Sequence, residues 1–216
     1  MNIGDDRMKA SKLLKFVGVG MVFSSFLFAC SHKDSDVKTI GVLQYMEHGA
    51  LDAAYEGFIA GLAEEGYIEG ENIKIDLKNA QGDLTTTQTI ANQYVSDDVD
   101  MMFAIATQAV QSAYNATKDI PILMTAVTDP VEAGVVKDWN QSGTNVTGTS
   151  DLTPVAKQME LIQELLPEAK TVGILYTTSE VNSEIQVALA EEAAAKLGLD
   201  IIKVGITSVN EIPNAI

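Results

Sequence analysis

Residues 100–106, DMMFAIA, form a nearly continuous apolar run, and the polar pair Thr107-Gln108 follows at once. Such a run without alternation is typical of a central strand in a parallel sheet, because helices cover both of its faces. A helix is expected at 108–118 and another strand at 121–127. This strand–helix–strand order predicts an α/β fold, which the flanking segments can test.

The sequence before this run shows the same alternation between strand and helix. Strands are predicted at 38–43 and 72–77, where β-branched or alternating apolar residues occur. Between them, apolar residues within 51–62 recur every three or four positions, as on one face of a helix. Gly66 suits the end of that helix because glycine tolerates positive φ. Asp83 can cap the next helix.

The alternation resumes after the strand at 121–127, in a second group of units. Thr153-Pro154 opens a helix with a capping residue and a proline in the first turn. We therefore expect an amino-terminal α/β lobe at 38–145 and a carboxy-terminal α/β lobe at 146–216. The second lobe holds few strands and is expected to be incomplete. Its strands are predicted at 146–149, 171–176 and 199–205, with a helix at 179–197 ended by Gly198.

The amino terminus is typical of a lipoprotein signal peptide at 1–29. Residues 7–15 carry four bases, and the uncharged apolar run at 16–29 is shorter than the about 20 residues that span a bilayer. Leu27-Phe28-Ala29-Cys30 resembles a lipobox, at which signal peptidase cuts before a diacylated cysteine. We therefore expect residues 1–29 to be removed.

Cys30 is the predicted lipid attachment site, carrying acyl groups such as palmitate. It is the single cysteine of the chain, so an internal disulfide or a CxxC metal site is excluded, and a buried core cysteine is the alternative. Residues 30–37 would form a lipid-anchored tether. Two acyl chains suffice for stable anchoring, which predicts a location on the extracytoplasmic face of the cell membrane.

The charge of the chain restricts its partners. Asp and Glu number 30 against 14 Lys and Arg, a formal net charge of −16, and no arginine occurs beyond Arg7. Nucleic-acid binding requires clustered bases that neutralise phosphates, so nucleic acid is not an expected partner. An anionic ligand group would have to be held by lysine, by hydroxyl groups or by helix N-termini.

Polar loops follow the predicted strands, where ligands bind in open parallel sheets. They are rich in Thr, Ser, Asn, Gln and Asp, which suit a neutral or zwitterionic ligand. The alternative is that these residues cap helices or form turns, as Asp129-Pro130 can. The loops lie at 44–49, 79–83, 107–108, 125–130, 149–151 and 177–183.

The sequence contains none of the motifs GxSxG, GxGxxG, GxxxxGK[ST] or HExxH, and its two histidines are too few for a His-based metal site. We therefore expect no catalytic residue, metal or cofactor, and interpret the chain as a binding protein. His48 with Glu47 could serve an exported enzyme, although a lone histidine in a polar loop is more often solvated. Tyr45 or Trp139 could stack on a ligand ring.

Several stretches resemble the ABC-type substrate-binding lipoproteins that include bacterial tryptophan- and tyrosine-related binding proteins. The resemblance extends from residue 39 to 213. It implies a type I periplasmic-binding-protein fold, in which two Rossmann-like lobes of parallel sheet with flanking helices close on a ligand. The matching stretches include GVLQYMEH at 41–48, NAQGD at 79–83, ATQA at 106–109, AVTDP at 126–130 and YTTSEVNS at 176–183.

The resemblance also implies a function. The chain would be a monomeric solute-binding lipoprotein that captures an amino acid, such as tryptophan or phenylalanine, and delivers it to ABC permease subunits. The ligand ring would rest against loops 44–51 and 79–81, and its carboxylate would lie at helix N-termini. The acidic partner of its ammonium group is expected beyond residue 216. The candidate residues are Gln44, Glu47, Leu51, Asn79, Gln81, Thr107, Gln108, Thr128, Asp129, Ser179, Asn182 and Ser183.

Three alternatives remain. The same fold could bind a sugar or nucleoside, but such sites usually combine aromatic residues with Asp and Arg partners, and arginine is lacking here. An exported enzyme would show turnover that depends on His48. A receptor domain would more often continue into a transmembrane helix than carry a lipobox.

Overall fold

The computed structural model describes residues 37–215. The expected signal peptide at 1–29, the lipid site Cys30 and nearly all of the tether lie outside the described residues. No helix within 37–215 is long and apolar enough to cross a membrane.

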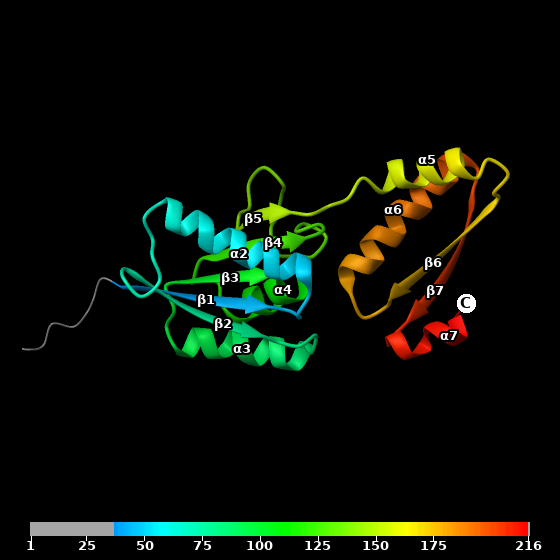
Figure 1. The fold of residues 1–216 in the computed structure, drawn as a ribbon. Helices are drawn as coiled ribbons and strands as arrows, with labels where there is room; N and C mark the ends of the chain where they lie inside the picture. Colours follow the sequence, from blue (N-terminus) through cyan, green and yellow to red (C-terminus); the bar gives the residue numbers. More distant parts are fainter. Residues whose placement is uncertain (1–36, 216) are drawn as a thin grey trace, which may run out of the picture. The chain divides into compact units, whose positions relative to one another are not determined.

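A five-stranded parallel sheet forms the first lobe, with strand order β2-β1-β3-β4-β5 (Figure 1). The apolar run at 100–106 contains β3, which lies at the centre of this sheet. Four of its five residues are buried, as expected for a strand covered on both faces. The strands are β1 Lys38–Gln44, β2 Ile73–Asn79, β3 Met101–Ile105, β4 Ile122–Val127 and β5 Val146–Ser150.

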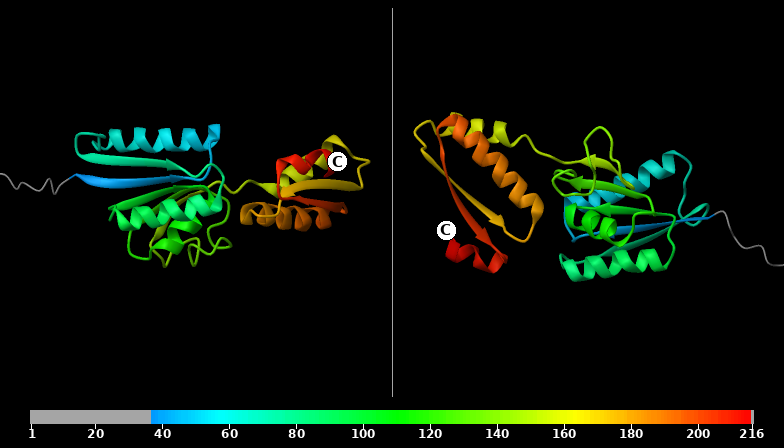
Figure 2. Two further views of the ribbon diagram at one scale, coloured as in Figure 1. Left: turned by 90° about the horizontal axis from the view of Figure 1, so that it is seen from below. Right: turned by 180° about the vertical axis from the view of Figure 1, so that it is seen from behind.

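Helices cover both faces of the first sheet (Figure 2). Helix α2 packs on one face, and α3 and α4 lie together on the other. Successive side chains of β1 point to opposite faces of the sheet, so Val42 packs against α2 and Leu43 packs against α3 and α4. On the α2 side, Phe58 stacks on Phe103 with ring centroids 4.0 Å apart. The helices are α2 Gly49–Glu64, α3 Leu84–Ser96 and α4 Thr107–Ala116.

Strand β5 extends the first sheet beyond the expected lobe boundary at residue 145. The segment was expected as the first strand of the second lobe, but Val146 pairs with Ile122 of β4. The loop at 128–145, which has no helical periodicity, returns the chain to the open edge of β4. Four of the five residues of β5 are exposed, as suits an edge strand.

The second lobe has two parallel strands and its own apolar core. Its strands pair from Thr171↔Asp200 to Thr177↔Ile206. Met159 and Ala194 are among the buried residues that join α5 to α6. The elements are α5 Val155–Leu165, β6 Thr171–Thr177, α6 Val181–Leu197, β7 Asp200–Ile206, the 3-10 helix η1 Val209–Glu211 and α7 Ile212–Ala215. The predicted α/β fold, with strands and helices in the predicted order, is confirmed.

Tyr94 ties α3 to the first sheet. It is completely buried, and its hydroxyl lies 3.0 Å from the Val42 carbonyl oxygen and 2.6 Å from that of Asp76. Its ring occupies the space above Gly41, where an added Cβ would stand 2.8 Å from the ring. Burial, followed by the charge of Asp76, raises the pKa of Tyr94, so the phenol stays neutral.

We expect Tyr94→Phe to lower the free energy of unfolding by about 1–3 kcal/mol, because buried carbonyl groups lose their donor. Urea denaturation followed by circular dichroism measures this. Because the pKa of Tyr94 is raised in the folded state, its contribution to the free energy of unfolding is complete below about pH 10. This contribution declines as the pH rises further. The variant should therefore lose less stability than wild type between about pH 10 and 11.

The exposed Tyr67 provides the control. Tyr67→Phe should change stability by less than about 0.5 kcal/mol. Identical unfolding curves for wild type and Tyr94→Phe would contradict the anchoring role.

Candidate functional site

The carboxyl ends of the parallel strands share one edge of the first sheet (Figure 1). From this edge the chain enters α2, α3 and α4. Four polar side chains are buried here, with exposed fractions from 2% to 6%. They are Gln44 at the end of β1, Thr107 and Gln108 after β3, and Thr128 after β4. All four were predicted as site residues.

These buried groups do not all find partners within the protein. The Gln44 oxygen Oε1 and the hydroxyl groups of Thr107 and Thr128 have no hydrogen-bond partner among the described residues. They are nevertheless not enclosed, since Asn145 Oδ1 is the one fully buried side-chain nitrogen or oxygen atom that lacks a partner within 37–215. Because buried polar atoms are normally paired, three open ones at one edge mark a place for ligand or water.

The start of α4 is a second feature of this edge. Ala106, its N-cap residue, provides no side-chain hydrogen bond, whereas His48 caps α2 and Asp83 caps α3. The pKa of Asp83 is lowered chiefly by the hydrogen bond from the Thr86 backbone N–H. Helix α4 thus presents uncapped N–H groups and the positive end of its dipole beside Thr107, an arrangement that favours an anion.

Backbone strain gathers at the same edge. Gln81, Ala106 and Ala126 adopt positive φ of 54°, 85° and 54°, and they lie at the carboxyl ends of β2, β3 and β4. Such conformations cost about 1–3 kcal/mol each for residues with a side chain and are common at functional sites. Asp98 is the fourth such residue described, and it lies in the turn after α3.

The start of α6 carries the predicted residues of the second lobe. Asn182 and Ser183 lie in its first turn, each 3.5 Å from the Glu180 carboxylate. Gln108 Nε2 donates to Asn182 Oδ1 at 2.8 Å, so two predicted residues from different lobes meet. Ser179 is exposed and precedes the helix, which begins two residues later than predicted.

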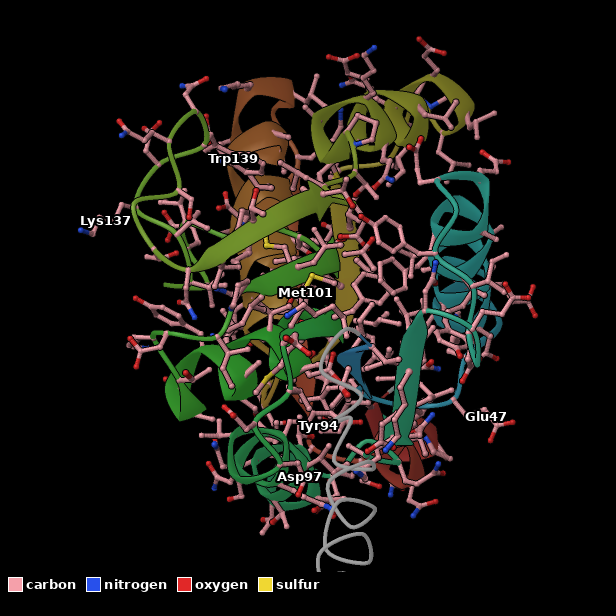
Figure 3. All side chains as sticks on the ribbon, turned by 90° about the vertical axis from the view of Figure 1, so that its left-hand side faces the viewer. Glu47, Tyr94, Asp97, Met101, Lys137 and Trp139 are labelled. Carbon is pink, nitrogen blue, oxygen red and sulfur yellow. The ribbon has the colours of Figure 1, made fainter. Side chains whose placement is uncertain are left out.

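Other predicted residues have local structural roles. Asn79 Oδ1 accepts from the Gln81 backbone N–H at 2.8 Å. Asp129 Oδ1 accepts from the backbone N–H groups of Val131 and Glu132, so Asp129 forms a turn, the alternative to a ligand contact. Leu51 packs into the core beneath α2. Glu47 is exposed, and Figure 3 shows its side chain at the periphery.

Two aromatic residues considered for ring stacking lie in unlike surroundings. Tyr45 is 8% exposed, and its hydroxyl donates to the Gly82 carbonyl at 2.9 Å. Burial, then the charges of Glu180 and Asp83, raises the pKa of Tyr45. Trp139 is 53% exposed in the loop between β4 and β5 (Figure 3). Tyr45 is therefore a buried residue that packs below the carboxyl edge of the sheet, whereas Trp139 lies at the surface.

Sequence reasoning omitted Asp52 from the site. Its carboxylate accepts from Gln44 Nε2 at 2.7 Å, a contact that links α2 to the end of β1. The signal for it was the helical spacing, because Asp52 lies in the first turn of a helix that follows β1. No group of three or more His, Cys, Asp or Glu within 37–215 is arranged to hold a metal ion.

Comparison with known proteins agrees with this architecture. The family model described as ABC transporter substrate binding protein matches residues 39–216. The chain belongs to this family. This assignment confirms the family resemblance predicted from the strand-end motifs. The members of this family are described as substrate-binding proteins.

Two relatives are similar over nearly all of the described residues. The tyrosine-binding protein of Clostridioides difficile is 46% identical over 222 residues, covering 97% of this chain and 64% of its own length. A Streptococcus pneumoniae ABC domain, solved in complex with L-Trp, is 44% identical with a TM-score of 0.79. That match covers 83% of this chain and 60% of the other, so the chain spans about three fifths of these relatives.

A more distant structure identifies the fold type. The leucine-binding protein of Thermotoga maritima is 16% identical with a TM-score of 0.63, over 80% of this chain and 49% of that one. The chain therefore has the type I periplasmic-binding-protein fold that was predicted. It shares this fold with substrate-binding family members.

We expect Ala106→Gly to stabilise the protein by about 1 kcal/mol. Glycine removes about 1–3 kcal/mol of strain at φ 85° and adds about 0.5–1 kcal/mol of unfolded-state entropy. Thermal and urea denaturation measure the change. Ala113→Gly, in the middle of α4, is the control and should destabilise by about 1 kcal/mol. Equal losses in both variants would rule out strain at Ala106.

Proposed function

We propose that this chain is the solute-binding lipoprotein of an ABC importer, and that it binds an aromatic amino acid at the carboxyl edge of the first sheet. The observation that carries the proposal is the group of buried polar side chains with open polar atoms beside an uncapped helix N-terminus. A zwitterionic ligand supplies both the donors and the acceptors that these atoms lack.

The ligand carboxylate would lie at the start of α4. Backbone N–H groups and the helix dipole favour a negative charge there, and the Thr107 hydroxyl can donate to it. No arginine occurs beyond Arg7, so a bidentate guanidinium is not available for this role. Asn182, hydrogen-bonded to Gln108, would bring the start of α6 to the same ligand.

The ligand class is inferred from the relatives. One relative is named as a tyrosine-binding protein, and another was solved in complex with L-Trp, at 46% and 44% identity. We therefore expect L-tyrosine, L-tryptophan or L-phenylalanine. Without arginine, a sugar or nucleoside site is less well supported, and the family assignment favours binding over an exported enzyme.

The remaining parts of the proposal concern location and partners. Cys30 would carry the lipid that holds the protein on the extracytoplasmic face of the cell membrane, after removal of residues 1–29. The protein would act as a monomer and deliver its ligand to ABC permease subunits. Support for this comes from the lipobox-like sequence and the family to which the chain belongs.

Calorimetric titration of the full chain in detergent with L-tyrosine, L-tryptophan and L-phenylalanine tests the ligand. Ligand at 100 times its Kd should stabilise the protein by about 2.7 kcal/mol, which a thermal shift also detects. Thr107→Val should weaken binding about 10-fold, since a hydrogen bond of about 1.4 kcal/mol is lost. Thr89→Val, at an exposed position in the middle of α3, should bind as wild type does.

Binding of a sugar or nucleoside in place of these amino acids would refute the ligand assignment. Unchanged affinity in Thr107→Val would place the carboxylate elsewhere.

The lipid anchor is tested with Cys30→Ser. We expect wild type to sediment with membranes and to gain mass corresponding to two acyl chains, because two chains give stable anchoring. The variant should appear in the soluble or secreted fraction with unchanged ligand affinity. Membrane retention of Cys30→Ser would show that another segment holds the protein.

A further inference from the structure

The amide of Gln44 is held in one orientation by two acceptors. Its Nε2 lies 2.9 Å from the Met46 carbonyl oxygen and 2.7 Å from Asp52 Oδ1. A carbonyl and a carboxylate can only accept hydrogen bonds, so both must face the NH₂ group of the amide. The opposite orientation would bring three oxygens together. The oxygen Oε1 therefore points away from both partners.

This oxygen is an acceptor without a donor. The Gln44 residue is 3% exposed, yet its Oε1 receives no hydrogen bond from any described residue and is not fully enclosed. An unpaired acceptor on a buried residue costs free energy unless water or a ligand supplies a donor. The complementary ligand group is thus an N–H or O–H donor.

The Gln44 acceptor lies one strand away from the proposed carboxylate position. Gln44 pairs with Ile105 of β3, and the following residue's N–H donates to the Ile105 carbonyl at 3.3 Å. Neighbouring strands are about 4.8 Å apart, and Thr107 lies two residues beyond Ile105. An amino acid carries its ammonium and carboxylate groups on one carbon. Its binding site therefore requires a hydrogen-bond acceptor and an anion site at the ends of neighbouring strands, where Gln44 and Thr107 lie.

The local charge selects a cationic donor. The Asp52 carboxylate accepts a hydrogen bond from the Gln44 amide and places a negative charge beside it. No lysine or arginine occurs between residues 39 and 73 to offset this charge. The base nearest in register, Lys78 opposite Leu43, places its ammonium 4.5 Å from the Tyr94 ring centroid. Tyr94 belongs to the α3–α4 side of the sheet, whereas Asp52 lies on α2. An ammonium group is therefore favoured over a neutral hydroxyl group.

We propose that Gln44 and Asp52 form the ammonium subsite for the ligand, with Gln44 Oε1 as the acceptor and Asp52 as the residue that positions the amide and supplies the charge. This inference rests on the proposed function. It assigns the head-group acceptor within 37–215, whereas the family resemblance implies a partner beyond residue 216 and a ring-contacting role for the loop at 44–51.

The experiment compares amino acids with their desamino analogues. The full chain in detergent is titrated with L-tryptophan and indole-3-propanoate, and with L-tyrosine and 3-(4-hydroxyphenyl)propanoate. The variants are Gln44→Met, which keeps the length and removes the acceptor, and Asp52→Asn, which keeps the shape and removes the charge. Glu56→Gln, an exposed carboxylate one turn further along α2, is the matched control.

Wild type should prefer each amino acid over its analogue by at least about 100-fold. Both variants should reduce this preference about 10-fold or more through weaker amino-acid binding, while affinity for the analogues stays within about threefold. The control should retain the wild-type preference. Melting temperatures without ligand show whether each variant folds, and Asp52→Asn decides the matter if Gln44→Met does not fold.

The outcomes separate the two proposals. Failure of wild type to bind any aromatic amino acid would overturn the proposed function and this subsite with it. Wild-type binding with an unchanged preference in both variants would overturn the subsite alone. Equal losses of affinity for the amino acid and for its analogue would show that Gln44 and Asp52 have only a structural role. A variant that lost only the discrimination between tyrosine and phenylalanine would place the phenol at Gln44 and refute the ammonium assignment.

Discussion

The parallel pairing of β1 with β3 is the constraint on which the rest of the structure depends. The register from Ile40↔Met101 to Gln44↔Ile105 places two apolar strands side by side under helices on both faces. The apolar run has to end where each strand leaves the sheet, and in a parallel pair both ends fall at one edge. The first polar side chains of both connections are therefore neighbours, and they are buried because α2 and α4 begin immediately beside them.

The carboxyl edge of the first sheet carries several features that lower the stability of the unliganded protein. Three non-glycine residues with positive φ lie there, α4 starts without a side-chain cap, and three buried polar residues keep a free acceptor or hydroxyl group. Each of these features costs free energy in the unliganded protein. By contrast, side chains cap the first turns of α2 and α3, and the Tyr94 hydroxyl is paired with a backbone carbonyl group. This contrast supports the proposed binding surface without reference to any relative.

The fold could be predicted from local pattern, while the site could be predicted only in part. The run at 100–106 and the three-and-four spacing at 51–62 reflect burial, so they specify β3 and α2 directly. The partner of β5 depends on where the aperiodic loop at 128–145 leads, which no local pattern encodes. Asn79 and Asp129 could not be told from turn-forming residues, because the same side chains serve both roles. Asp52 escaped notice because its role exists only through contact with Gln44.

On the proposed assignment, the first lobe recognises the part that all amino acids share. The acceptor at the end of β1 and the donors at the start of α4 are fixed by one sheet register, so their spacing cannot change without disturbing the core beneath them. The groups that distinguish one side chain from another must then come from loops that are free to vary. Such a separation would allow relatives about 45% identical to this chain, whose names record different ligands, to share one way of holding the head group. On this assignment, head-group recognition would be tied to the fold itself, and ligand choice would be confined to the residues around it.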